Sequence, residues 1–166
     1  MRPLLIAEAI LLFVSPSHAH VYPPGTFSID GIPVVCGSVV TVVNNNIHDF
    51  AQSDLKGHIF VNLIVLSQMP TVLKLWGYAH ECGHYQMGPN ETAADCWAIR
   101  TGREQGWFKN VDFSELEAMF ANNSGDLYHP PGPVRVANMK KCFGSSEAKH
   151  SHSDGVDVTE PEGSFC

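Results

Sequence analysis

Residues 80–95 read HECGHYQMGPNETAAD, which places two helical segments on either side of a Gly-Pro turn. The first helix is predicted over residues 70–87, opened by a proline and ended by the Gly-Pro pair. The second is predicted over residues 91–102, where Asn90 is a good N-cap and an acidic residue follows at the positive end of the helix. Because so short a turn reverses the chain, the two helices are expected to pack as an antiparallel pair.

The first helix carries the pattern HExxH. Residues four positions apart lie on one face of a helix, so the imidazoles of His80 and His84 can reach a single ion. A catalytic zinc site takes three protein ligands and leaves one position open for water, from which Glu81 can accept a proton. Two histidines on an ordinary helix produce the same pattern, so HExxH is a weak signal on its own.

The second helix begins with the pattern NExxAD. In an antiparallel pair Glu91 lies beside His84, and Asp95, one turn further on, lies beside His80. Glu91 can then complete the ligand set, while Asp95 can accept the spare N–H of His80 and fix the tautomer of the ring. The alternative interpretation of Glu91 and Asp95 is a capped and solvated helix start.

The combination of HExxH and NExxAD resembles the gluzincin clan of zinc metallopeptidases. The resemblance implies that His80, His84 and Glu91 bind the metal and that Glu81 is the general base. It also implies that Asp95 supports one of the metal ligands from behind. The expected cofactor is therefore Zn²⁺, held at the join of the two predicted helices.

Residues 129–135, HPPGPVR, look like a segment that follows the zinc motifs in the CAAX-prenyl-endopeptidase-like family. In that family a His or an Arg after the metal site helps to stabilise the oxyanion, which implies this role for His129 or Arg135. The resemblance covers about residues 61–141. The link between the two zinc motifs is shorter here than in that family, and the transmembrane helices of its membrane members have no counterpart.

Strands are predicted before the helix pair. Short β-branched runs separated by Gly and Pro, at residues 26–29, 33–36 and 39–43, are typical of a small meander. Residues 58–66, HIFVNLIVL, are the strongest strand candidate. This strand is either an edge strand beside the HExxH helix, to which a peptide adds as a further strand, or a buried core strand.

Two further helices are predicted after the pair, at residues 114–122 and 134–143. The expected fold class is α+β, with a small N-terminal β meander packed on the two motif helices and further helices following. The domain is expected over residues 20–143. Residues 144–166 are polar and lack periodicity, so we expect a disordered tail there.

The first nineteen residues have the features of a secretory signal peptide. Arg2 supplies a positive n-region, and residues 4–14 are apolar except for Glu8. Ser17-His18-Ala19 places small residues at the −3 and −1 positions of a cleavage site. The alternative is an N-terminal membrane anchor, but the apolar run is too short to span about 30 Å of hydrocarbon. We expect a periplasmic or secreted protein with no membrane span after cleavage.

Cysteine content agrees with export, which permits disulfides. An odd number of cysteines leaves at least one thiol unpaired within a monomer. Cys82, inside HExxH, is either a thiol packed behind the site or a disulfide partner. We predict a bridge from Cys142 to Cys96 or Cys82. All five cysteines follow the predicted cleavage site: Cys36, Cys82, Cys96, Cys142 and Cys166.

Composition bounds the remaining possibilities. A chain of 166 residues with 44% hydrophobic residues is long enough for one compact domain. The formal net charge is −7, and no long cluster of Lys and Arg occurs, so the composition argues against a nucleic-acid partner.

The leading hypothesis is an exported zinc metalloendopeptidase that hydrolyses peptide or protein substrates. Zinc would polarise the scissile carbonyl, Glu81 would take a proton from water, and His129 or Arg135 would stabilise the oxyanion. The alternative is a non-catalytic periplasmic module that binds a metal or a peptide on a gluzincin-like scaffold. The presence of Glu81 argues against such a module, which has no need of a base. A third hypothesis is a disulfide-stapled secreted protein in which HExxH is accidental.

Overall fold

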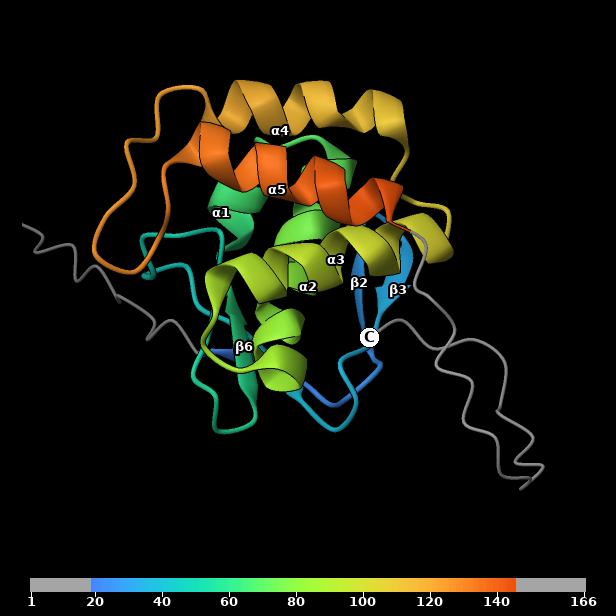
Figure 1. The fold of residues 1–166 in the computed structure, drawn as a ribbon. Helices are drawn as coiled ribbons and strands as arrows, with labels where there is room; N and C mark the ends of the chain where they lie inside the picture. Colours follow the sequence, from blue (N-terminus) through green and yellow to red (C-terminus); the bar gives the residue numbers. More distant parts are fainter. Residues whose placement is uncertain (1–18, 146–166) are drawn as a thin grey trace, which may run out of the picture.

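The structure is a computed structural model that describes residues 19–145. Residues 1–18 of the predicted signal peptide and residues 146–166 of the predicted tail lie outside the described residues. Within residues 19–145 the chain combines helices with a small N-terminal sheet, so the α+β class is confirmed (Figure 1). No helix in this range is long and apolar enough to cross a membrane.

Short strands come first along the chain and helices follow. The strands are β1 (His20–Tyr22), β2 (Phe27–Ile29), β3 (Ile32–Val34), β4 (Val40–Val43), β5 (Ala51–Ser53) and β6 (His58–Val61). The helices are α1 (Leu63–Leu66), α2 (Thr71–Met87), α3 (Glu91–Glu104), α4 (Phe113–Phe120) and α5 (Gly132–Gly144), with a 3-10 turn (Asn110–Asp112) before α4.

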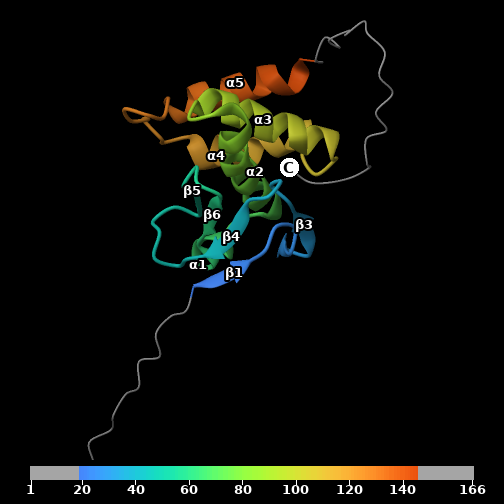
Figure 2. The ribbon, with the colours of Figure 1, turned by 90° about the horizontal axis from the view of Figure 1, so that it is seen from below.

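The strands form two sheets rather than a single meander. The larger sheet has the order β1-β4-β6-β5, in which β4 and β6 are parallel and the other neighbours are antiparallel. The strands β2 and β3 form a separate antiparallel hairpin. β5 is therefore an edge strand of the larger sheet, and its outer edge lies toward α2 (Figure 2).

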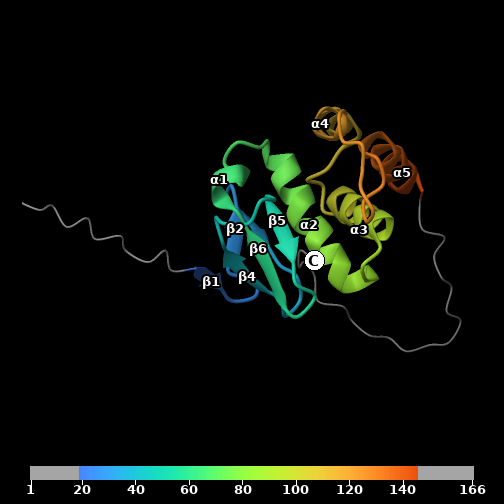
Figure 3. The same ribbon diagram turned by 90° about the vertical axis from the view of Figure 1, so that its left-hand side faces the viewer.

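The helix α2 lies between the strands and the helices α3, α4 and α5, whereas α1 lies on the side of the strands (Figure 3). On one side, Leu75 and Tyr78 join a buried cluster with the strands; on the other, Leu73 and Trp76 join a buried cluster with α3, α4 and α5. A helix that is apolar on most of its circumference is stable only when it is buried on both sides. The helix that carries the HExxH segment is therefore packed between two buried clusters.

The predicted strand at residues 58–66 is wrong in its second half. β6 ends at Val61, and α1 begins at Leu63 because the side chain of Asn62 accepts hydrogen bonds from the N–H groups of Ile64 and Val65. This is an N-cap, which favours a helix over a continued strand. β6 also lies inside the sheet, so the edge-strand hypothesis does not apply to it and the edge belongs to β5.

Two disulfides tie the helices to their surroundings. Cys36, between β3 and β4, is bonded to Cys82 in α2, and Cys96 in α3 is bonded to Cys142 in α5. Of the two partners predicted for Cys142, the structure selects Cys96. Cys166 lies outside the described residues.

Candidate metal centre

The two motif helices pack closely and run antiparallel. A side chain at Gly83 would bring its Cβ within 2.9 Å of the carbonyl oxygen of Ala94, so only glycine permits this approach. Asn90 caps α3 by accepting a hydrogen bond from the N–H of Ala93, as predicted. This packing places the first two turns of α3 beside the HExxH turns of α2.

Glu91 faces both histidines of the HExxH pattern. Its Oε2 lies 3.2 Å from Nε2 of His80, and its Oε1 lies 3.4 Å from Nε2 of His84. The Oε2 atom is buried and has no hydrogen-bond partner among the described residues. The carboxylate is therefore placed between two imidazole nitrogens that face it from one helix.

The Nδ1 atom of each histidine at the site lies close to an oxygen atom. For His80 this atom is Oδ1 of Asp95, at 2.9 Å, and for His84 it is the carbonyl oxygen of Gly88, at 3.0 Å. Such partners fix the orientation of an imidazole and leave Nε2 free to bind a metal. The geometric relation expected between Asp95 and His80 is thus present.

His129 has the same arrangement, although it comes from the loop between α4 and α5. Its Nδ1 lies 3.0 Å from both carboxylate oxygens of Asp126, and its Nε2 lies 3.4 Å from Oε1 of Glu91. Its side chain is 41% exposed, whereas those of His80 and His84 are almost fully buried. His129 therefore lies at the open side of the site.

Arg135 supports the carboxylates of α3. Its Nε and Nη2 donate to the two oxygens of Asp95 at 2.8 and 2.7 Å, and Nη2 lies 3.6 Å from Oε2 of Glu91. The guanidinium also stacks over the ring of Phe120, 4.8 Å from its centroid. Arg135 is buried and committed to Asp95, so its geometry favours holding the site together over contacting a substrate.

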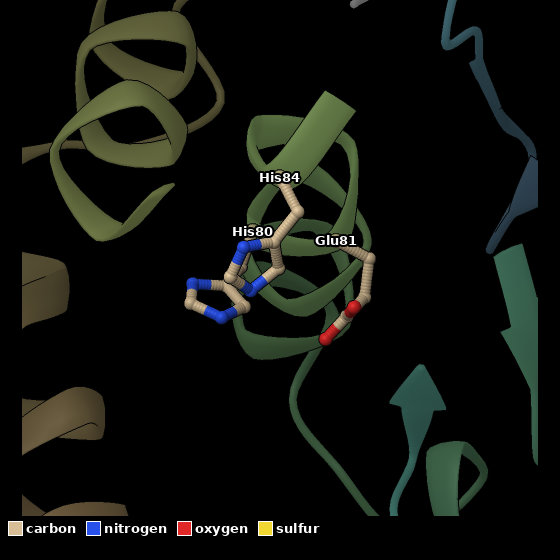
Figure 4. A group of neighbouring side chains, drawn as sticks. All are labelled: His80, Glu81 and His84. Carbon is tan, nitrogen blue, oxygen red and sulfur yellow. The ribbon is translucent and has the colours of Figure 1, made fainter. Parts of the chain in front are cut away.

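Glu81 extends from the neighbouring face of the helix, on the side of the strands (Figure 4). Its Oε2 accepts a hydrogen bond of 2.7 Å from the backbone N–H of Ser53 in β5. Ligand atoms of His80, Glu81 and His84 nevertheless lie within 4.8 Å of one another, so these three residues can hold a metal ion.

The site is strongly polarised. Burial alone would lower the pKa of His80, but the carboxylates of Asp95 and Glu91 outweigh burial and raise this pKa to about 9. The hydrogen bond that His84 donates to Glu91 likewise raises the pKa of His84. Burial opposes ionisation of Glu91, yet the two histidines hold its pKa far below the usual range. Without a metal, protons occupy the positions that a cation would take.

The spacing of the donor atoms fits a zinc ion. Zinc binds imidazole nitrogen and carboxylate oxygen at about 2.0–2.2 Å in a tetrahedral arrangement, which puts neighbouring ligand atoms roughly 3.3–3.5 Å apart. The two distances from Glu91 to His80 and His84, 3.2 and 3.4 Å, are close to this value. A buried carboxylate oxygen without a hydrogen-bond partner is also the kind of atom that a cation would satisfy.

A cavity of about 320 Å³ opens beside His80 and Glu81. Its walls combine aromatic and aliphatic side chains with polar groups of the site. The lining residues are Asp49, Phe50, Ala51, Trp76, His80, Glu81, Met119, Phe120, Asn123, Asp126, His129 and Arg135. A side chain of a bound molecule can therefore enter next to the predicted base.

The structure brings together all seven residues named from the sequence: His80, Glu81, His84, Glu91, Asp95, His129 and Arg135. Sequence reasoning missed Asp126 and Ser53. Asp126 lies three residues before His129, a spacing that gives a weak hint of contact, whereas the contribution of Ser53 is a backbone N–H and leaves no trace in its residue type.

Comparison of the chain with protein-family models, with curated proteins and with solved structures found no match. Function therefore has to follow from the side chains themselves.

Proposed function

We propose that the protein is an exported zinc metalloendopeptidase of the gluzincin type, with His80, His84 and Glu91 as the zinc ligands. The observation that carries the proposal is the convergence of two Nε2 atoms on the two carboxylate oxygens of Glu91, at 3.2 and 3.4 Å. Each histidine also has an oxygen partner at Nδ1, the arrangement found around most metal-bound histidines.

Glu91 suits the role of third ligand better than Glu81 does. Both oxygens of Glu91 already face imidazole nitrogens, and one of them has no hydrogen bond of its own. Glu81 instead accepts a hydrogen bond from the N–H of Ser53, on the strand side of the helix. Two histidines and one carboxylate leave the fourth position open, as catalytic zinc sites require.

The proposed reaction is the hydrolysis of a peptide bond. A bound zinc ion supplies Lewis-acid chemistry, polarising the scissile carbonyl and lowering the pKa of the attacking water. Glu81 accepts a proton from that water and delivers it to the leaving amine. His129 is oriented by Asp126 and exposed at the open side of the site; with a proton on both ring nitrogens it donates from Nε2 to the developing oxyanion. Arg135 holds Asp95 and Glu91 in place.

The edge strand β5 offers a route for binding an extended peptide. Ala51 does not form the hydrogen-bonded pairs of the β5–β6 ladder, so its N–H and C=O point outward. The same residue lines the cavity beside Glu81. A peptide that pairs with Ala51 as an added strand can place one side chain in the cavity.

Two disulfides among the described residues support export, because such bonds persist in oxidising compartments. The second candidate function is a non-catalytic module that binds a metal or a peptide. Glu81 lies beside the two histidines, but its hydrogen bond is to Ser53. This position favours a general base over a carboxylate with no catalytic role.

The test uses fluorescein-labelled casein and the purified protein with and without a zinc chelator. The proposal expects cleavage by the wild type, loss of cleavage after chelation and recovery on adding zinc. Glu81→Gln should keep the metal and the fold but lose about 10²–10⁴-fold in rate, because an amide cannot accept the proton. Bound zinc without cleavage of casein or of a mixed peptide library would favour the binding module.

A further inference from the structure

The outer edge of β5 presents two backbone N–H groups, of which only one has a partner. The N–H of Asp54 donates to His58 in β6, and the C=O of Phe50 accepts from Asn62, the residue after β6, so hydrogen-bonded pairs alternate along the strand. Ala51 and Ser53 lie between these pairs and direct their N–H groups outward. The N–H of Ser53 donates to Glu81, whereas that of Ala51 has no partner among the described residues.

Three residues on one face of α2, Gly77, Glu81 and Tyr85, hold the outer edge of β5 in position. At Gly77 the ring of Phe50 packs so closely that a Cβ would lie 2.1 Å from it. Two turns beyond Gly77, the hydroxyl of Tyr85 donates to Asp54, the residue after β5. Between these contacts lies Glu81, one turn from each, with its bond to Ser53. Successive turns of the helix thus hold the strand and restrict the movement of its backbone.

Glu81 has a second chemically reasonable position. Its carboxylate, with the nitrogens of His80 and His84, lies within a group that can hold a metal, and the ligand atoms are at most 4.8 Å apart. A carboxylate that enters the coordination sphere closes the site and no longer serves as a base. A catalytic site therefore requires an interaction that keeps Glu81 close to the metal without letting it become a ligand.

We propose that the backbone N–H of Ser53 provides this interaction. Its hydrogen bond holds Glu81 outside the coordination sphere and leaves the fourth position open. The inference rests on the proposed function, since it concerns the base of that reaction. The short distance of 2.7 Å and the partly buried setting suit a hydrogen bond to a charged carboxylate. Ser53 is a positioning residue that acts through Glu81.

The first experiment compares amide hydrogen exchange at Ser53 and Ala51 by NMR in the zinc-loaded wild-type protein. Both N–H groups point outward from the same strand, but Ala51 is the more buried residue, so burial by itself would slow exchange more at Ala51 than at Ser53. Ser53 should exchange at least about tenfold more slowly than Ala51, and Glu81→Ala should remove the difference. Equal exchange at the two positions in the wild type would overturn the inference.

The second experiment replaces the metal with cobalt(II), whose visible absorption reports the identity and number of its ligands. Ser53→Pro removes the N–H at an outward position where an edge strand tolerates proline. Its cobalt absorption should shift, because the carboxylate of Glu81 then takes the fourth position, and casein hydrolysis should drop about 10²-fold. Ser53→Ala, which keeps the N–H, and Ala51→Pro, which removes the unpartnered N–H, should both keep the wild-type cobalt spectrum.

The outcomes separate this inference from the proposed function. A wild-type protein that binds neither zinc nor cobalt contradicts both. Metal-dependent hydrolysis by the wild type, together with an unchanged cobalt spectrum and rate in Ser53→Pro, contradicts only the role of Ser53. If Ser53→Pro does not fold, the exchange comparison in the wild type still decides.

Discussion

Oδ1 of Asp95 lies 2.9 Å from Nδ1 of His80, while Nε2 of the same ring faces Glu91. The imidazole of His80 thus contacts the carboxylate of Asp95 through one nitrogen and that of Glu91 through the other. Asp95 is almost completely buried and also accepts two hydrogen bonds from Arg135. The charge of Asp95 is therefore shared between His80, a proposed metal ligand, and the guanidinium of Arg135.

Asp95→Asn should weaken zinc binding about 10–100-fold, because the amide no longer stabilises and orients His80 as a carboxylate does. Competition with a chromophoric chelator measures the affinity. Equal affinities in the wild type and the variant would mean that the contact does not tune the metal ligand. Circular dichroism, as a control, should show that α2 and α3 remain helical.

Arg135→Met should lower the free energy of unfolding by about 3–5 kcal/mol, because it leaves the buried carboxylate of Asp95 without its strongest partner. Lys140→Met on the same helix is a matched control. Lys140 pairs with Glu117 at the surface, and loss of an exposed pair costs about 1 kcal/mol or less. Urea unfolding measures both, and similar losses in the two variants would argue against a structural role for Arg135.

His129→Ala should lower the rate of peptide hydrolysis about 10²–10³-fold, the usual effect of removing one oxyanion donor. Zinc affinity should stay within about twofold of the wild type, because His129 is not proposed as a ligand. Asp126→Asn should have a smaller effect on rate, since it only loosens the ring. A large loss of zinc in His129→Ala would instead identify His129 as a metal ligand.

The metal-free protein should lose stability as the pH rises from about 6.5 to about 9. The pKa of His80 is raised from 6.5 to about 9, since the carboxylates of Asp95 and Glu91 outweigh burial. The charged ring therefore stabilises the fold fully below pH 6.5, and this contribution is lost through the higher pKa. Urea unfolding across this range checks the sign; stability that increases with pH would contradict it.

Zinc binding has the opposite dependence on pH, because the metal must displace the same proton. Affinity should rise by about tenfold per pH unit while His80 remains protonated. Chelator competition in the same buffers measures this slope.

The helix pair was predictable because its signals are local. Gly88 and Pro89 end α2, Asn90 caps α3, and the 3.6-residue period then determines which side chains meet across the pair. That period places Glu91 beside both histidines and Asp95 beside His80, as the structure has them. Because the two helices pack antiparallel, the spacing of these residues in the sequence determines which of their side chains come into contact.

Features that depend on tertiary contacts were not predictable. β5 is three residues long and reads AQS, which carries no β-branched signal; it exists because it pairs with β6 and docks on α2. The residues LIVL of α1 favour a strand, but the Asn62 cap starts a helix there. For Cys82 the sequence left a buried thiol and a disulfide equally open, and the fold places it beside Cys36.

The proposal that His80, His84 and Glu91 bind zinc is tested most directly by the zinc content of the purified protein, determined by elemental analysis on the wild type and on His84→Ala. We predict about one zinc per wild-type chain and a large loss in the variant, because His84 supplies one of three protein ligands. A wild-type protein without bound zinc after exposure to zinc, or a His84→Ala variant that keeps a full equivalent, would contradict it.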